Sequence, residues 1–445
     1  MMRGMSSPRL LLSLAAGALV AGAFCTFAGD ALAQSKPFPQ GGGYPHGYLP
    51  KTVSTLDAKA SYDAWKAKYV KTDCGGGTAR VEFASPMGTT VSEGMGYGMV
   101  LAAYYGDRTT FDGLWRFVQA HYGSHKMMGW KVNCTGFIQG EGGEGSATDG
   151  DTDIAFALIA AVDQWGDAYR KPALDFLVTM QRVDYIKCPP PSGRNIARRG
   201  NWDGACDRTN TSYFMPAYLR VFTDFSGDPF WAKAADDEES IWLANRDPKT
   251  GLIANESDVN GKTVQGQGVV DYNGCRISWR AVLDYLWFGS AAAKDVADRL
   301  TDFASGVGIS KLVDGYNTDG SRTKDAKWPQ LNAWVGSWAT GAMSKDQPTL
   351  DAFAADLRGI DVDNGGYYGS SLRALYLLTL SGNLWKPGTP PTPGGGVMPA
   401  APTPKLGRFG CEQAPARDGW GGAAGAGAFA SVLVLSAVRL RRRRS

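Results

Sequence analysis

Apolar residues recur at the spacing of an α-helix along most of the chain from Leu56 onward. Eleven segments carry this pattern clearly, and a weaker one near Trp328–Thr340 makes twelve. The clear segments are Leu56–Val70, Met95–Tyr105, Phe111–His121, Asp153–Trp165, Lys171–Arg182, Tyr213–Phe225, Pro229–Leu243, Arg276–Phe288, Ala291–Ala304, Thr349–Leu357 and Gly369–Leu380. Strand-like alternation is sparse, so the pattern predicts an all-α domain. Twelve helices fit six αα-hairpins; their number alone equally suits a solenoid, but no fixed-period repeat is visible.

Both ends of the chain differ in composition from this helical region. Residues 1–33 have the pattern of a secretory signal peptide, with an apolar stretch that ends at Ala31-Leu32-Ala33. A lipoprotein cleavage before Cys25 is the alternative, which the neighbouring Phe24 disfavours. Residues 34–50 are rich in Gly and Pro and predict an extended leader.

The C-terminal end predicts a linker and a tail. Residues 387–420, which include Cys411, are rich in Pro and Gly and form the predicted linker. In residues 421–445, small or apolar residues precede an Arg cluster; their length is near the lower limit for a membrane span, and the cluster favours a cytoplasmic end. The order of Cys, spacer, apolar segment and Arg cluster resembles the myxobacterial C-terminal sorting signal, with a plain membrane anchor as the alternative. We therefore expect a protein that is secreted or attached to the membrane or cell surface.

Charge and cysteine content further narrow the class of protein. The formal net charge is +3, but without the two terminal segments 39 basic and 42 acidic residues remain, so a nucleic-acid partner is not expected.

Of the seven cysteines, Cys188 and Cys206 flank a Pro/Gly/Arg-rich loop and are the best local disulfide pair. Cys74 with Cys134 is the second candidate, although connectivity cannot be deduced from sequence, and Cys275 is expected to be a buried free thiol.

No metal site or cofactor is expected. The sequence contains no C-x-x-C pair, which makes zinc improbable. His121 and His125 have the i, i+4 spacing of a metal pair, but no Glu follows His121 as it does in a zinc protease helix. With only three His in the chain, a Ser-His-Asp hydrolase is also disfavoured.

The segment Ala147–Trp165 (ATDGDTDIAFALIAAVDQW) carries the most specific chemistry. It places Asp149, Asp151 and Asp153 within five residues, just before or within the start of a predicted buried helix. Close carboxylates repel one another unless something offsets their charge, and a helix N-terminus favours an anion. A charged N-cap or a D-x-D-x-D calcium loop is the alternative, but an EF-hand loop requires a later Gly and a bidentate Glu.

This segment resembles the signature of glycoside hydrolase family 8, which runs A-[ST]-D-[AG]-D, two free positions, [IM]-A and a small or apolar helix closed by Trp. Four further segments resemble parts of the same family, and the resemblance covers roughly residues 40 to 386. They are Ser92–Gly98, Ser212–Tyr218, Arg276–Gly289 and Tyr367–Leu380. The resemblance implies an (α/α)6 barrel of six helical hairpins, with residues 51–386 as the catalytic domain.

The family resemblance also assigns roles to two carboxylates. Glu93 matches the acid segment, and its Gly- and Met-rich surroundings would exclude water and raise the pKa of a carboxyl group. A capping Glu at the start of a helix is the alternative. Asp149 matches the residue that grips the sugar at the cleavage point; some descriptions of the family call it the nucleophile, but an inverting mechanism favours substrate distortion. Asp151 is expected to be structural.

The catalytic base is where the sequence departs from the family pattern. The commonest form reads Tyr-Asp, two residues, Arg, whereas this chain has Asn273 between Tyr272 and Gly274. An amide cannot take a proton from water at neutral pH. The remaining candidates for the base are Asp271 first, then Glu256 and Asp258.

Aromatic residues outside the helical stripes are expected to bind sugar rings. These are Trp130, Trp202, Tyr213, Trp328 and Trp334; the predicted substrate-binding set is Trp130, Trp202, Tyr213, Tyr272, Asn273 and Arg276. Trp residues within helical patterns belong to the predicted core: Trp165, Trp231, Trp242 and Trp287.

Together these features predict a monomeric, secreted, inverting enzyme that cleaves internal β-1,4 bonds of cellulose or a related β-glucan. Chitosan, xylan and lichenan are alternative substrates, because the family covers several β-linked chains. A non-catalytic carbohydrate-binding protein of the same fold is the second alternative, since Asn273 stands where the base is usual.

Overall fold

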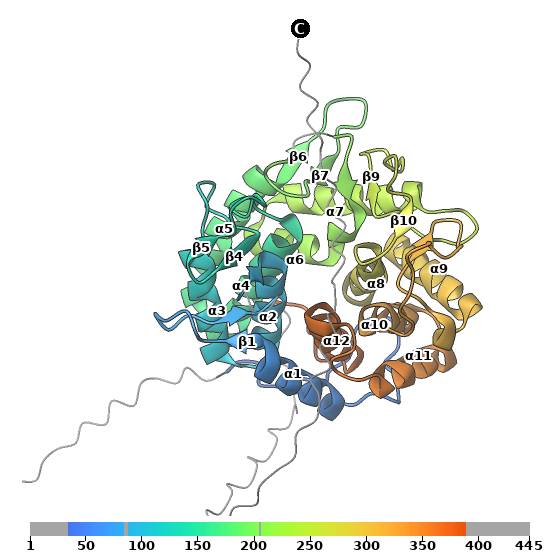
Figure 1. The fold of residues 1–445 in the computed structure, drawn as a ribbon, viewed down its shortest axis with the longest axis horizontal. Helices are drawn as coiled ribbons and strands as arrows, with labels where there is room; N and C mark the ends of the chain where they lie inside the picture. The colour runs from blue at the N-terminus through green and yellow to red at the C-terminus, as the bar shows by residue number, and fades with distance from the viewer. Residues whose placement is uncertain (1–33, 84–87, 204–205, 389–445) are drawn as a thin grey trace, which may run out of the picture. The chain divides into compact units, whose positions relative to one another are not determined.

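The computed structural model describes residues 34–388 except 84–87 and 204–205 (Figure 1). The predicted signal peptide, the tail and nearly all of the predicted linker lie outside the described residues. Each of the twelve predicted helical segments corresponds to a helix in the structure. The helices are α1 (Thr55–Tyr69), α2 (Ser92–Tyr104), α3 (Arg108–Ala120), α4 (Thr148–Trp165), α5 (Arg170–Asp184), α6 (Pro216–Ser226), α7 (Pro229–Asn245), α8 (Ile277–Phe288), α9 (Ala291–Val307), α10 (Asn332–Gly341), α11 (Gln347–Gly359) and α12 (Gly366–Leu380).

The even-numbered helices form an inner ring. Each of α2, α4, α6, α8 and α10 packs against the next, and α12 closes the ring against α2 (Figure 1). Each odd-numbered helix lies outside: α1 packs on α12, and α3, α5, α7, α9 and α11 pack on the inner helix that precedes each of them. This arrangement confirms the predicted (α/α)6 barrel.

Amino-acid patterning explains which helices lie inside. In α4 only Asp163 is less than fully buried, and in α2 only Glu93 is, so neither helix has a solvent face. Outer helices such as α3 and α9 bury one stripe and expose the other, as expected of surface helices. The four Trp residues predicted for the core, those of α4, α7 and α8, are all buried.

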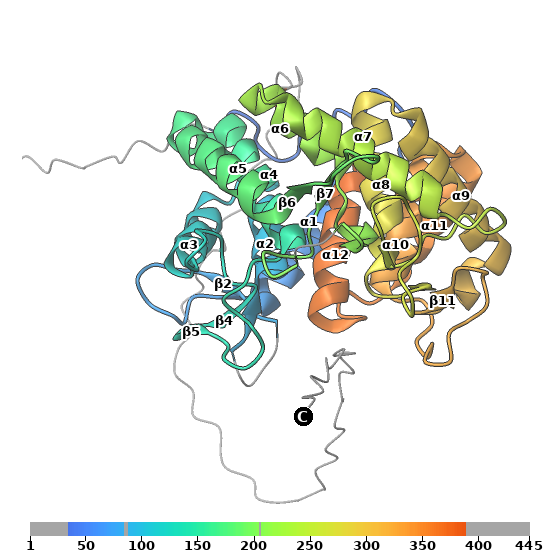
Figure 2. The same ribbon diagram turned by 90° about the horizontal axis from the view of Figure 1, so that it is seen from above.

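Short strands order the loops between helices. They form five small antiparallel sheets, which pair as β1–β2, β3–β4–β5, β6–β7, β8–β9 and β10–β11. Their bounds are β1 (Val70–Lys71), β2 (Arg80–Val81), β3 (Thr90–Val91), β4 (Lys131–Asn133), β5 (Gly136–Phe137), β6 (Tyr185–Lys187), β7 (Asn195–Ala197), β8 (Thr209–Asn210), β9 (Glu256–Ser257), β10 (Val269–Val270) and β11 (Tyr316–Asn317). Strands β4, β5 and β11 lie on one side of the barrel, the lower side of Figure 2.

The leader, residues 34–50, packs against the ends of the inner helices where their last residues lie. The Lys36 backbone N–H donates to the Gln164 side chain near the end of α4, and Gln164 donates back to the Lys36 carbonyl. The Tyr44 hydroxyl donates to the Thr379 carbonyl near the end of α12. The leader therefore satisfies polar groups that the ends of helices leave unpaired.

Two disulfides and one thiol match the sequence prediction. Cys74 is bonded to Cys134 and Cys188 to Cys206, while Cys275 is free and buried.

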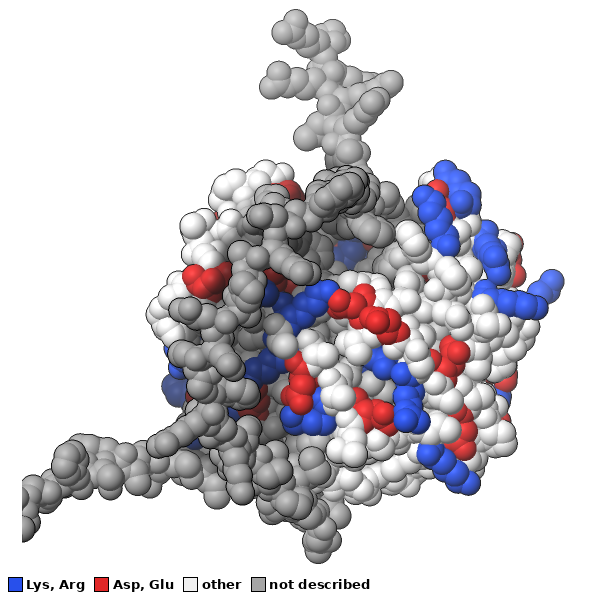
Figure 3. All heavy atoms as spheres, turned by 60° about the horizontal axis from the view of Figure 1, so that its bottom comes forward, with Lys and Arg blue, Asp and Glu red and all other residues white. Residues whose placement is uncertain are grey.

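No helix within the described residues is long and apolar enough to cross a membrane. Acidic and basic side chains are interspersed on the face shown in Figure 3.

Helices α2 and α4 approach closely because glycines face each other across their contact. A Cβ atom on Gly96 would lie 2.8 Å from the Gly150 carbonyl oxygen and 2.7 Å from the Asp153 Cβ. A Cβ atom on Gly150 would lie 2.6 Å from the Glu93 backbone nitrogen and 2.5 Å from the Ser92 carbonyl carbon. Because these neighbours are mostly backbone, a methyl group can be accommodated only if the helices move apart.

We therefore expect Gly150→Ala to lower the free energy of unfolding by about 1–3 kcal/mol, the usual cost of overpacking a core. Chemical denaturation measures this change. The control is Gly306→Ala in α9, where the added Cβ meets nothing within 4 Å. That change should be neutral or stabilise the helix by about 0.5–1 kcal/mol. Equal effects at both positions would contradict close packing between α2 and α4.

Candidate active site

The first residues of the six inner helices meet at one end of the barrel. Because each outer helix returns the chain to the opposite end, the inner helices run in the same direction. Glu93 and Asp149 lie in the first turns of α2 and α4, Arg276 directly precedes α8, and Tyr367 is the second residue of α12. The positive ends of the helix dipoles therefore point toward this site and favour carboxylates there.

Arg276 joins the two carboxylates. Its Nη1 donates to Glu93 Oε2 at 2.7 Å and to Asp149 Oδ2 at 2.9 Å. Both bonds come from the same nitrogen. The distance between Glu93 Oε2 and Asp149 Oδ2 therefore cannot exceed the sum of the two bond lengths. Nη2 donates to Ser212 Oγ at 2.9 Å, and the guanidinium carbon lies 5.4 Å from the Tyr213 ring centroid. Arg276 is 2% exposed, so these contacts replace its hydration.

Glu93 has the environment of a proton donor. The pKa of its carboxyl group is raised to about 7, mainly by burial; the Arg276 charge acts against this rise and the Asp149 charge adds to it. The Tyr367 hydroxyl donates to Glu93 Oε1 at 3.2 Å, which also lowers the pKa. At neutral pH a substantial fraction of Glu93 is therefore protonated.

A second buried ion pair lies behind the first. Arg280 donates from Nη2 to Asp153 Oδ2 at 3.4 Å and from Nη1 to the Tyr213 carbonyl at 3.2 Å. Burial raises the pKa of Asp153 to about 7 while Arg280 lowers it. Sequence reasoning named neither Arg280 nor Tyr367 as part of the site. Both lie inside segments that resemble the family, which is the only sequence signal that singles them out.

Asn273 connects to this cluster through neutral groups. Its Oδ1 accepts from Asn210 Nδ2 at 3.2 Å, and Asn210 Oδ1 accepts from the Ser212 hydroxyl at 2.8 Å. The nearby Asp271 accepts from Asn255 Nδ2 at 2.7 Å and from the Asn273 backbone N–H at 3.1 Å. Both of these hydrogen bonds are accepted by Oδ1 of Asp271. The Asp271 side chain is partly exposed.

The other two candidates for the base have structural partners. Glu256 is buried and pairs with Arg199 through one oxygen and with Arg208 through the other. Asp258 Oδ1 accepts from the backbone N–H groups of residues 260 and 262, as in a turn. Within the described residues, Glu256 alone of the three is ion-paired; Asp258 and Asp271 each accept from the backbone N–H two residues later, and Asp271 also accepts from the Asn255 side chain.

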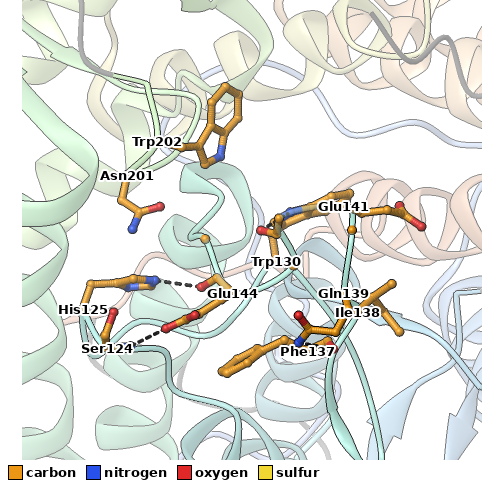
Figure 4. A pocket seen from close by; sticks show the side chains of 14 residues that line it. Ser124, His125, Trp130, Phe137, Ile138, Gln139, Glu141, Glu144, Asn201 and Trp202 are labelled. Atoms are coloured by element: carbon orange, nitrogen blue, oxygen red, sulfur yellow. Dashed lines mark hydrogen bonds between the residues drawn. The ribbon is translucent and has the colours of Figure 1, made fainter. Parts of the chain in front are cut away.

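Trp130 and Trp202 line one pocket of about 730 Å³ (Figure 4). Trp202 is 59% exposed, and the Arg199 guanidinium lies 4.8 Å from its ring centroid. Trp130 donates from its indole N–H to the Gly142 carbonyl at 3.1 Å. An exposed aromatic face beside a hollow suits the C–H face of a sugar ring.

The other aromatic residues divide between surface and core. Tyr272 and Trp328 are about half exposed. Trp334 was predicted to bind sugar, but it is 1% exposed and packs against Trp338 and Tyr316, so that prediction is wrong. The helix α10 begins two residues before Trp334 and turns its ring into the core.

Potential metal ligands have other partners. Within the described ranges, Asp73, Cys74 and Cys134 form the one cluster close enough to hold an ion, but the two sulfurs are joined in a disulfide. Both ring nitrogens of His121 contact backbone carbonyl oxygens, at 2.9 Å each.

Comparison with known proteins agrees with this geometry. Residues 38–382 match the sequence model of the family described as Glycosyl hydrolases family 8. Endoglucanase A of Acetivibrio thermocellus is 33% identical over 385 residues, which cover 82% of this chain and 77% of that protein. Beta-glucanase of Niallia circulans is 32% identical over 392 residues, covering 79% and 92%. The apo structure of a beta-1,3-1,4-glucanase from Paenibacillus sp. X4 has a TM-score of 0.71 at 29% identity and covers 80% of this chain and 100% of that one. The chain belongs to glycosyl hydrolase family 8.

Proposed function

We propose that the protein is an inverting endo-glycosidase that cleaves internal β-1,4 bonds of cellulose or a related β-glucan. The observation that carries this proposal is the pair of carboxylates, Glu93 and Asp149, held by the buried Arg276 at one end of the barrel. Relatives named endoglucanase and beta-glucanase support a glucan substrate. We also propose export, a monomer and attachment through the tail, on the sequence patterns at the two ends of the chain.

In the proposed mechanism, Glu93 donates its proton to the glycosidic oxygen as the bond from that oxygen to the anomeric carbon breaks. A water molecule attacks the anomeric carbon from the opposite face and gives up a proton to a base. Asp149 accepts a hydrogen bond from a hydroxyl of the sugar at the cleavage point, an interaction that strengthens as positive charge develops on the ring. Trp130 and Trp202 hold sugar units farther along the chain.

We propose Asp271 as the base. Asn273 uses its side-chain carbonyl oxygen to accept from Asn210, and an amide cannot take a proton from water. Asp271 keeps one carboxylate oxygen outside its two described hydrogen bonds. Glu256 ranks below it because both of its oxygens are ion-paired with Arg residues. Asp258 ranks below it because its side-chain hydrogen bonds stay within its own loop, whereas Asp271 also bonds Asn255.

The substrate class is tested by reducing-sugar release from carboxymethylcellulose, barley β-glucan, xylan and chitosan. We expect release from the first two. Release confined to xylan or chitosan would move the substrate to those chains. Oligosaccharide binding without any cleavage would instead favour the non-catalytic carbohydrate-binding protein, for which Asn273 is the supporting feature.

Replacing Glu93 by Gln removes the proton but keeps the shape of the side chain. We expect kcat to fall by about 10²–10⁴-fold, the usual contribution of general acid catalysis, while oligosaccharide binding persists. Steady-state kinetics and calorimetry measure the two quantities. Asp175→Asn, a carboxyl-to-amide change in the exposed Lys171–Asp175 pair, is the control and should change neither. Retained turnover in Glu93→Gln would remove Glu93 from the role of acid.

The pH profile tests the protonation of Glu93 directly. Because the acid form is required and its pKa is about 7, kcat/KM should fall as the pH rises through about 7. Tyr367→Phe removes a hydrogen bond that lowers this pKa, so the fall should move to higher pH. Tyr44→Phe, which loses a hydrogen bond to the end of α12, is the control and should leave the profile in place. A shift to lower pH in Tyr367→Phe would contradict the assignment.

The base is tested by two opposite substitutions. Asp271→Asn should lower kcat by about 10²–10⁴-fold with KM nearly unchanged, because the group acts only in the transition state. Azide, which attacks the anomeric carbon without needing a base, should restore part of the turnover. Asp258→Asn is the matched control and should retain kcat. If the Asp271→Asn variant keeps its activity and the Asn273→Asp variant is more active than the wild type, a group other than Asp271 accepts the proton.

A further inference from the structure

Asp151 and Asp184 are two fully buried carboxyl groups that the proposed mechanism does not use. Asp151 lies in the first turn of α4 and Asp184 is the last residue of α5, and both are 0% exposed. Both carboxyl oxygens of Asp151 and Oδ2 of Asp184 are buried without another hydrogen-bond partner among the described residues, and the two side chains are close enough for a proton on one to be shared with the other. The Ala147 backbone N–H faces the Asp151 carboxyl group without making a hydrogen bond of good geometry.

The surroundings supply too little positive charge for two ions. Desolvation by burial raises the pKa of Asp151 well above its ordinary value, and the Asp184 charge raises it further. Burial also raises the pKa of Asp184, against which a hydrogen bond from Ser146 and the charge of Arg198 act. The other ionisable groups that face the pair, Asp149, Tyr122 and Tyr185, come from α4, from the segment after α3 and from β6. Arg198 is the one cation among these described groups, and burial still raises the pKa of both carboxyl groups in its presence, which favours one proton between them.

Hydrogen bonds connect this carboxyl pair to the pocket that Trp130 and Trp202 line. Ser146 Oγ donates to Asp184 Oδ1 at 2.6 Å and accepts from the Asn201 backbone N–H at 2.9 Å. The Ser146 backbone N–H donates to Asn201 Oδ1 at 3.1 Å. Asn201 precedes Trp202, and both line the pocket of Figure 4.

We propose that Asp151 and Asp184 share a single proton, and that this carboxyl pair positions the start of α4, which carries Asp149, against the Asn201–Trp202 loop. The Asp151 hydroxyl donates to Asp184, and Asp184 as the carboxylate accepts from both Asp151 and Ser146. Both aspartates are positioning residues because neither lies at the surface where a substrate could touch it. The catalytic consequence rests on the proposed function, whereas the shared proton does not.

Two substitutions of similar size separate the shared proton from simple packing. Asp151→Asn places an amide N–H where the carboxyl O–H donates, so kcat on barley β-glucan should stay within about threefold of wild type. Asp151→Leu leaves the Asp184 carboxylate without that donor, so kcat should fall by at least about 10-fold, as misplaced catalytic groups cause. Equal kcat values in the two variants would overturn the positioning role.

A second measurement needs no activity and no Leu variant. The folded-state pKa of Asp151 is raised, so its contribution to stability is fully present below the unfolded-state pKa and is lost as the pH rises toward the folded-state value. Asp151→Asn removes this titration. The Tm of the Asn variant relative to wild type should therefore increase steadily from pH 4 to pH 9, whereas Asp175→Asn on the exposed face of α5 should show no such trend.

The outcomes distinguish the two proposals. A Tm difference between Asp151→Asn and wild type that does not vary with pH would overturn the shared proton, whatever the enzyme cleaves. A pH-dependent difference in a protein that cleaves none of the four polysaccharides would support the shared proton and contradict the proposed function.

Discussion

The Arg276 guanidinium lies almost fully buried between the Glu93 and Asp149 carboxylates, and the chemistry of the site depends on this contact. A buried cation loses its hydration, and only well-placed acceptors can compensate for that loss. Burial and the nearby Asp149 charge both work against ionisation of Glu93. With Arg276 beside it, the Glu93 carboxyl group still has a pKa of about 7, because burial outweighs the attraction of the cation. One shared nitrogen atom thus holds both carboxyl groups in place at the first turns of α2 and α4.

The barrel makes this contact possible by geometry. Inner helices in a common direction bring first turns together, and glycines at Gly96 and Gly150 let α2 and α4 approach until Glu93 and Asp149 can share Arg276. At the opposite helix ends, the leader satisfies polar groups through Gln164 and Thr379. The site therefore occupies the end of the barrel that no leader covers among the described residues. At this end, long loops can form the walls of pockets such as the one that Trp130 and Trp202 line.

The sequence predicted the helices well because each carries its own apolar pattern, and the disulfides because few pairings were plausible. It placed the start of the second helix at Met95, although α2 begins at Ser92, because Ser-Glu-Gly offers no apolar periodicity. Trp334 was misassigned because a residue two positions into a helix cannot be placed on a face without the neighbouring helices. The Arg280–Asp153 pair joins residues 127 positions apart, which only closure of the ring of inner helices brings together. The Asp151–Asp184 contact joins the start of α4 to the end of α5 and depends on how these two helices pack against each other.

The amide at Asn273 changes the charge balance around Arg276. Asn210 donates to Asn273 and accepts from Ser212, which in turn accepts from Arg276, so the connection between position 273 and the guanidinium consists of neutral groups. A carboxyl group at that position would add a further acidic group to a site where Arg276 already contacts Glu93 and Asp149, and where Arg280 pairs with Asp153. Asp271 lies two residues earlier and is anchored by Asn255. A carboxyl group at 271 stays outside this chain of hydrogen bonds to Arg276, and it is a partly exposed carboxyl group in the same segment.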